Sequence, residues 1–210
     1  MQAISEFFWG KELATHPSLN FDDYKGIQSV FTLKELKILW GRYVTICNDM
    51  GFLTQSRFMM MPEVCHSQMA KMAFYYETTF TDSEDRKIDF NQFVHILSKL
   101  SPLTPNTEKV EYLFDVVEKH TRKEHLESKY LIKEDIKQLM TFIISTQMND
   151  ELIDVLVDSV WETLKERVIL NESREGKRPN QNGQFMGVSR GQLTAHLCSL
   201  DISNFLTVQF

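Results

Sequence analysis

Apolar residues recur at spacings of three and four along most of the chain, the pattern of amphipathic helices. One such run consists of Leu36, Leu39, Trp40, Tyr43 and Cys47. It follows residues 32–35 (Thr-Leu-Lys-Glu), a capping box that predicts where the helix begins. Comparable runs predict further helices through Met69, Met72, Ala73, Tyr76 and Phe80; Val110, Leu113, Phe114 and Val117; Ile136, Leu139, Met140 and Ile143; Leu152, Val155, Leu156, Val160 and Leu164; and Leu193 and Leu197. Strand signals are weak and short, so the predicted fold class is all-α.

A short motif recurs between these predicted helices. In residues 87–93 (Lys-Ile-Asp-Phe-Asn-Gln-Phe) an apolar residue is followed by aromatic residues two and five positions later. This is typical of an EF-hand loop entering its second helix, where the eighth loop residue is apolar because it pairs with the sister loop. Ile88 is the predicted eighth residue here, and the pattern repeats around Leu53, Leu131 and Val188. The sequence therefore predicts four helix–loop–helix units, forming two lobes of paired units with short β-bridges between their loops.

Three passages resemble the calcineurin B superfamily, which includes the calcineurin B-homologous proteins and the calcium- and integrin-binding proteins. Residues 58–64 (Phe-Met-Met-Met-Pro-Glu-Val) are similar to the Phe-x-x-x-Pro-Glu-Leu motif after that family's first loop. Residues 88–114 are similar to the second hand and linker of the integrin-binding branch, and residues 200–208 to the tail of calcineurin B. The resemblance covers roughly residues 30 to 210. It implies lobes that hold a partner's amphipathic helix in a hydrophobic groove.

The predicted domain organisation follows from the helix pattern and the resemblance. Residues 1–30 form an N-terminal arm, 31–102 the N-lobe with the first two units, 103–199 the C-lobe with the other two, and 200–210 a C-terminal tail. Residues 171–187 are polar and glycine-containing, with almost no large apolar residue before Phe185 and Met186. We expect them to be a mobile insertion, because such a segment buries too little surface to offset its ordering entropy.

The ligand positions of the predicted loops do not suit calcium. That ion needs oxygen ligands from loop positions 1, 3, 5, 7, 9 and 12, with glycine at position 6. The first loop has Gly51 at position 6 but Ile46, Met50 and Arg57 at positions 1, 5 and 12. The third loop region is too long and too basic, and the fourth has extra residues before Val188 and ends with Gln192.

The second loop has Arg86 at position 6 and offers only a vestigial ligand set: Thr81, Ser83, Asp85, Lys87, Asp89 and Gln92. Gln92 at position 12 lacks the two charged oxygens of the usual glutamate. We therefore expect no metal and no cofactor. A weak calcium or magnesium sensor acting through this loop is the alternative.

Composition narrows the remaining classes of function. The net charge of −6 argues against nucleic acid as a partner, because phosphate binding needs a basic face. Cys47, Cys65 and Cys198 are widely spaced and are predicted to be reduced thiols of a cytoplasmic protein. No apolar run approaches the roughly 20 residues that span a bilayer, and no signal peptide is expected.

A thiol-dependent enzyme using Cys65 and His66 is the alternative from another class. Adjacent residues on a helix point about 100° apart, and no orienting acid is evident, so we expect no catalytic residue and no enzyme.

The predicted function is that of a non-catalytic, calcium-independent regulatory or adaptor subunit. By resemblance, its partner is an amphipathic helix of a larger protein, such as a phosphatase catalytic subunit, a transporter, a channel or a receptor tail. This implies a role such as ion-transport regulation at the cytoplasmic face of a membrane, reached only through the partner. The 15 Phe and 10 Met residues suit an adaptable groove, and they equally suit the cores of two lobes.

By resemblance, the groove is lined by residues on helices that flank the cleft: Phe93, Ile96, Leu97, Leu100, Leu113, Phe114, Phe142 and Leu156. The apolar tail, residues 200–210, is expected to cover this groove when no partner is bound. The rival interpretation makes the tail an element of the C-lobe core.

Overall fold

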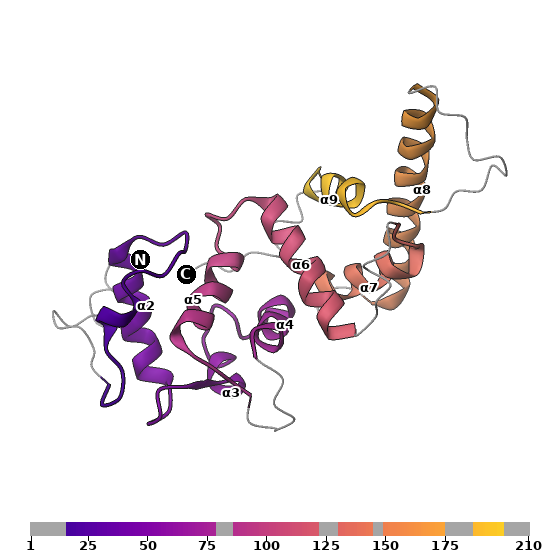
Figure 1. Ribbon diagram of the computed structural model, residues 1–210. Coiled ribbons are helices and arrows are strands. Elements are labelled where there is room, and N and C mark those ends of the chain that lie inside the picture. Colours follow the sequence, from indigo (N-terminus) through magenta and orange to yellow (C-terminus); the bar gives the residue numbers. More distant parts are fainter. Residues whose placement is uncertain (1–15, 79–85, 122–129, 145–148, 175–186, 200–210) are drawn as a thin grey trace, which may run out of the picture. The chain divides into compact units, whose positions relative to one another are not determined.

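The computed structural model describes residues 16–78, 86–121, 130–144, 149–174 and 187–199 (Figure 1). Within these ranges the secondary structure is almost entirely helical, which confirms the predicted all-α class. Two compact units are distinguished, the first ending at Thr104 and the second beginning at Pro105. In the same ranges, no helix combines the length and the apolar character needed to cross a membrane.

Unit 1 contains two helix–loop–helix units preceded by one short helical turn. Its elements in chain order are η1 (Phe21–Tyr24), α2 (Leu33–Ile46), β1 (Leu53–Thr54), α3 (Gln55–Phe58), α4 (Gln68–Glu77), β2 (Lys87–Ile88) and α5 (Phe90–Leu100). Helix α2 begins as the sequence predicts. The Thr32 hydroxyl accepts a hydrogen bond from the Glu35 backbone N–H at 3.3 Å, and the Glu35 carboxylate accepts one from the Thr32 N–H at 2.7 Å. The two side chains thus satisfy backbone donors that have no partner within the helix.

The core of unit 1 is an aromatic cluster around Phe90. Its ring centroid lies 5.1 Å from that of Trp40 and 5.2 Å from that of Tyr24, both edge-on, the geometry that ring quadrupoles favour. Phe21 is 3% exposed and packs edge-on against Trp40. Residues 16–30 of the predicted N-terminal arm therefore contribute to this core, and residues 1–15 lie outside the described part of the chain.

Unit 2 contains α6 (Asn106–Thr121), α7 (Lys133–Ile144), α8 (Asp150–Arg174) and α9 (Arg190–Ser199). Helix α7 packs against α8, and α9 packs against α6 (Figure 1). The predicted face of α8 is wrong in its first half, because Leu152 and Val155 are 55% and 67% exposed. The stripe that α8 buries is Ile153, Val157, Val160, Leu164 and Val168. On α7, Lys137 and Lys133 form salt bridges of 2.5 Å with Asp154 and Asp158, which follow the buried Ile153 and Val157 in the chain.

The structure describes both ends of the segment predicted to be an insertion, residues 171–187. Helix α8 continues to Arg174, so residues 171–174, the first four of the predicted insertion, are helical. At the other end, Gly187 is buried beside the backbone of Leu131 with a φ of 140°, and a Cβ there would lie 2.5 Å from the Leu131 carbonyl oxygen. Only a residue without a Cβ fits this position. Residues 175–186, and the predicted tail at 200–210, lie outside the described residues.

Candidate functional site

The loops of each unit are joined by a short antiparallel β-bridge. In unit 1, β1 pairs with β2 so that Leu53 lies opposite Ile88. In unit 2, Leu131 and Val188 exchange two backbone hydrogen bonds of 2.7 and 3.0 Å. All four residues are at most 1% exposed. This confirms the pairing predicted for the eighth residue of each loop, and it fixes the numbering of the loop positions.

A buried tyrosine connects the two loops of unit 1. The Tyr43 hydroxyl on α2 lies 2.7 Å from the Gly51 carbonyl oxygen and 3.1 Å from that of Ile88, and it donates to them. Burial, followed by the electrostatic influence of Cys47, Asp89 and Tyr24, raises the pKa of Tyr43. The hydroxyl therefore keeps its proton and its role as a donor.

The first loop has the backbone turn of a calcium loop, but Ile46, Met50 and Arg57 at positions 1, 5 and 12 carry no side-chain oxygen. Gly51 at position 6 has a φ of 79°, and a Cβ there would lie 2.8 Å from the side chain of Leu19. At position 3, the Asn48 Oδ1 accepts hydrogen bonds from the N–H groups of Met50 at 3.1 Å and Phe52 at 2.9 Å. This side-chain oxygen in the early half of the loop is thus engaged by the loop's own backbone.

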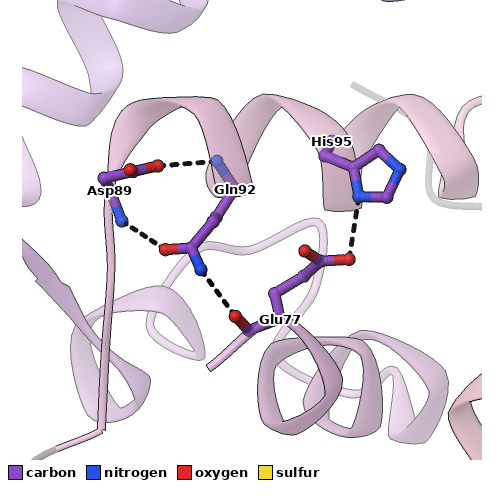
Figure 2. Close-up of polar contacts among 4 residues, drawn as sticks. All are labelled: Glu77, Asp89, Gln92 and His95. Carbon is purple, nitrogen blue, oxygen red and sulfur yellow. Dashed lines mark hydrogen bonds and ion pairs between the residues drawn. The ribbon is translucent and has the colours of Figure 1, made fainter. Parts of the chain in front are cut away.

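Position 12 of the second loop links its two helices directly (Figure 2). The Gln92 Oε1 accepts from the Asp89 backbone N–H at 2.9 Å, and the Asp89 Oδ1 accepts from the Gln92 N–H at 2.8 Å. The Gln92 amide nitrogen then donates to the Glu77 carbonyl oxygen at 2.5 Å. His95 Nδ1 lies 2.8 Å from the Glu77 carboxylate, one turn further along α5. The end of α4 and the start of α5 are therefore held together by protein groups.

Position 12 of this loop does not supply the ligand that calcium usually has there. Gln92 is uncharged, and both ends of its amide are occupied by backbone groups, so it cannot act as the bidentate carboxylate at position 12. Position 6 is Arg86, whose guanidinium lies 4.3 Å from the centre of the Tyr75 ring. Thr81, Ser83 and Asp85 of the predicted vestigial set lie outside the described residues.

The loops of unit 2 use the same capping arrangement. In the fourth loop, the Gln192 side chain accepts from the Ser189 N–H at 2.8 Å, as Gln92 does from Asp89. In the third, counting from Leu131 places Asp135 at position 12, where its carboxylate accepts from the Ile132 N–H at 2.9 Å. Sequence reasoning missed Asp135, although its spacing of four residues from Leu131 was a signal that could have found it. In the described ranges, no group of three or more His, Cys, Asp or Glu residues could hold a metal ion.

The side chain of Arg190 anchors helix α9 to helix α6. The Arg190 guanidinium donates to the Glu111 carbonyl oxygen at 3.0 Å and to the Asp115 carboxylate at 2.6 Å, both on α6. It lies 4.7 Å from the centre of the Phe114 ring, in cation–π contact. Arg190 thus joins the last helix of unit 2 to its first.

Six of the eight predicted groove residues lie in the cores of the two units. Phe93, Ile96, Leu97 and Leu100 on α5, and Leu113 and Phe114 on α6, are at most 1% exposed. Leu156 on α8 is half-buried, and the side chain of Phe142 on α7 lies outside the described residues. The structure brings the four α5 residues together in unit 1 and the two α6 residues together in unit 2. Their role in partner binding stays a prediction.

Cys65 lies in a turn between α3 and α4, so it and His66 are not the helical neighbours that the sequence predicts. Its thiol is half-buried and donates to the Pro62 carbonyl oxygen at 3.2 Å. Cys47, Cys65 and Cys198 are all free thiols. Burial raises the pKa of the Cys47 and Cys198 thiols, which favours their unreactive protonated form.

Two relatives from Dictyostelium discoideum, both calcineurin B subunits, share detectable sequence similarity with this chain. It is 24% identical to the type 2 protein over 139 residues, which are 66% of this chain and 69% of that protein. It is 23% identical to the type 1 protein over 146 residues, which are 68% and 76% of the two proteins. No family model matches the chain. The weak homology and the paired, bridged loops support a place in the calcineurin B-like EF-hand superfamily.

Proposed function

We propose that this chain is a non-catalytic, calcium-independent regulatory or adaptor subunit that binds an amphipathic helix of a larger protein. The observation that carries the proposal is the Gln92 amide, which joins α4 to α5 where a calcium sensor uses an ion. In sensors, calcium binding moves the helix pair from a closed to an open arrangement. A hydrogen bond supplied by the chain itself is present at every calcium concentration, so the helix pair is set by packing.

The similarity to calcineurin B subunits supports the partner-binding half of the proposal. The proposed mode places one apolar face of a partner helix in a groove lined by the predicted residues. Because the α5 and α6 members are at most 1% exposed, binding to them requires the helices of a unit to move apart. Leu156 is already half-exposed beside the exposed Leu152 and Val155, and it is the proposed point of first contact.

Transporters, channels, receptor tails and phosphatase catalytic subunits are the proposed partner classes. A membrane-embedded member of these classes would bring the chain to the cytoplasmic face of a membrane. Both points follow from the family resemblance, and affinity purification is the experiment that identifies the partner.

Isothermal titration with calcium tests the first half of the proposal. The wild-type chain is expected to bind more weakly than the ~10⁻⁷–10⁻⁵ M range of sensor EF-hands. The double variant Arg86→Gly/Gln92→Glu, which restores the turn glycine and the position-12 carboxylate, is expected to bind more tightly than the wild type. A wild-type dissociation constant at or below ~10⁻⁵ M would establish the sensor alternative instead.

Affinity purification with mass spectrometry, in calcium and in chelator, tests the second half. The expected result is one partner recovered at equal yield in both buffers. Leu156→Glu is expected to reduce the yield, whereas Ile169→Glu, at a 49% exposed position on the same helix, is expected to leave it unchanged. Recovery only in calcium would contradict independence from the ion, and an unchanged yield with Leu156→Glu would contradict the groove.

A further inference from the structure

Arg57 stands at position 12 of the first loop and reaches back to the beginning of that loop. Its Nη1 donates to the Ile46 carbonyl oxygen at 3.2 Å and to the Cys47 carbonyl oxygen at 2.6 Å. Ile46 is the last residue of α2, and Cys47 is its C-cap. One guanidinium nitrogen thus connects loop positions 1, 2 and 12.

The positive charge of Arg57 lies at the C-terminal end of α2, where the helix dipole favours a cation. The last carbonyls of a helix have no partner within the helix, and they carry the negative end of its dipole. In an ion-bound loop, calcium joins ligands at positions 1 and 12 across the same span. We propose that the Arg57 guanidinium is the resident cation of the first loop, covalently attached, and does there what a bound calcium ion does in a functional EF-hand.

The neighbouring polar groups agree with a loop completed by protein donors. The carbonyl oxygen of Asn48, at position 3, lies 3.0 Å from His16 Nε2 and accepts a hydrogen bond from the Gly51 N–H at 2.8 Å. The Phe52 carbonyl oxygen, at position 7, accepts from the Asn48 N–H at 2.8 Å. Three consecutive carbonyls, at positions 1 to 3, therefore each have a donor within reach, and the loop closes around Arg57 and His16.

Arg57 at position 12 thus has a structural role in the first loop in addition to its unfavourable charge for calcium. From its charge alone an arginine there only repels calcium, whereas in the structure it joins the beginning of the loop to its end, the span that a bound calcium ion bridges. The inference goes beyond the proposed function, because it concerns how one loop folds rather than what the protein binds. It does not depend on the calcium affinity of the second loop.

Chemical rescue of the full-length Arg57→Ala variant provides the test. The matched control is Lys34→Ala, which removes one exposed positive charge from α2 without touching the loop. Circular dichroism melting is expected to show a Tm about 4–8 °C lower for Arg57→Ala than for Lys34→Ala. Hydrogen exchange is expected to quicken at the amides of Asn48, Gly51 and Phe52, whose hydrogen bonds shape the loop.

Millimolar ethylguanidinium chloride is then expected to restore part of the Tm and of the exchange protection in Arg57→Ala. The same concentrations of sodium chloride and of ethylammonium chloride are expected to do neither. Arg57→Lys should keep part of the stability, because an ammonium group supplies the charge without the planar donor geometry. If Arg57→Ala melts together with Lys34→Ala, or if ethylguanidinium rescues no more than sodium chloride does, Arg57 is not the resident cation.

Discussion

The side-chain amide of Gln92 donates a hydrogen bond of 2.5 Å to the backbone carbonyl of Glu77, fifteen residues earlier in the chain. Glu77 is the last residue of α4, so its carbonyl has no acceptor role within that helix. The other end of the same amide accepts from the Asp89 N–H at the start of α5. One neutral side chain therefore satisfies a backbone group at each of two helix ends (Figure 2).

Gln92→Glu is expected to destabilise unit 1 by about 1–3 kcal/mol in the absence of calcium. The carboxylate can still accept from the Asp89 N–H, but it turns an acceptor toward the Glu77 carbonyl in place of a donor. Urea denaturation measures the loss, with Gln28→Glu, an exposed position before α2, as the matched control. Equal stability of the two variants would show that the contact with Glu77 contributes nothing.

Tyr43→Phe is expected to cost about 1–3 kcal/mol, because the ring stays packed while the Gly51 and Ile88 carbonyls lose a buried donor. Tyr24→Phe, in the same aromatic cluster but only half-buried, is expected to cost less. Thermal melting followed by circular dichroism gives both values. A Tyr43→Phe variant as stable as the wild type would contradict the structural role of the hydroxyl.

Ile88→Ala is expected to cost about 2–5 kcal/mol, since Ile88 is fully buried and its removal leaves a cavity beside the bridge to Leu53. Leu103→Ala, at a 61% exposed position of the same unit, should change stability by no more than about 0.5 kcal/mol. Chemical denaturation of the two variants side by side tests the difference. Comparable losses would mean that the eighth loop residue is not a core position.

Acidification is expected to destabilise unit 2 through His196 on α9. Burial, and secondarily the charge of Arg167 3.4 Å away, lowers the pKa of His196 below its ordinary value of 6.5. Below pH 6.5 the unfolded chain therefore takes up a proton that the folded chain does not, and the free energy of unfolding falls as the pH falls.

Denaturation at pH ~7.5 and ~5.5 tests this linkage, because His196→Gln should show a smaller loss on acidification than the wild type does. His66→Gln, at an exposed position of unit 1, is the control and should retain the full loss. If His196→Gln and the wild type lose the same stability, the histidine does not contribute.

Local sequence was sufficient for the helix starts and for the bridge residues. Thr32 and Glu35 lie three residues apart, so their reciprocal hydrogen bonds require no tertiary contact. The positions of Leu53, Ile88, Leu131 and Val188 could be predicted because each follows from one short pattern repeated along the chain. These features could be predicted because each depends on residues that lie close together in the sequence.

Tertiary packing decided what local patterns left open. Helix α8 carries two apolar stripes, and the one through Ile153 and Val157 is buried because α7 packs there, while Leu152 and Val155 remain in solvent. The sequence likewise determined that Arg57 carries no ligand oxygen and that Gln92 lacks the two charged oxygens of a position-12 glutamate. That each donates instead to a backbone carbonyl at the end of a helix was decided only by the fold, because those carbonyls lie ten and more residues earlier in the chain.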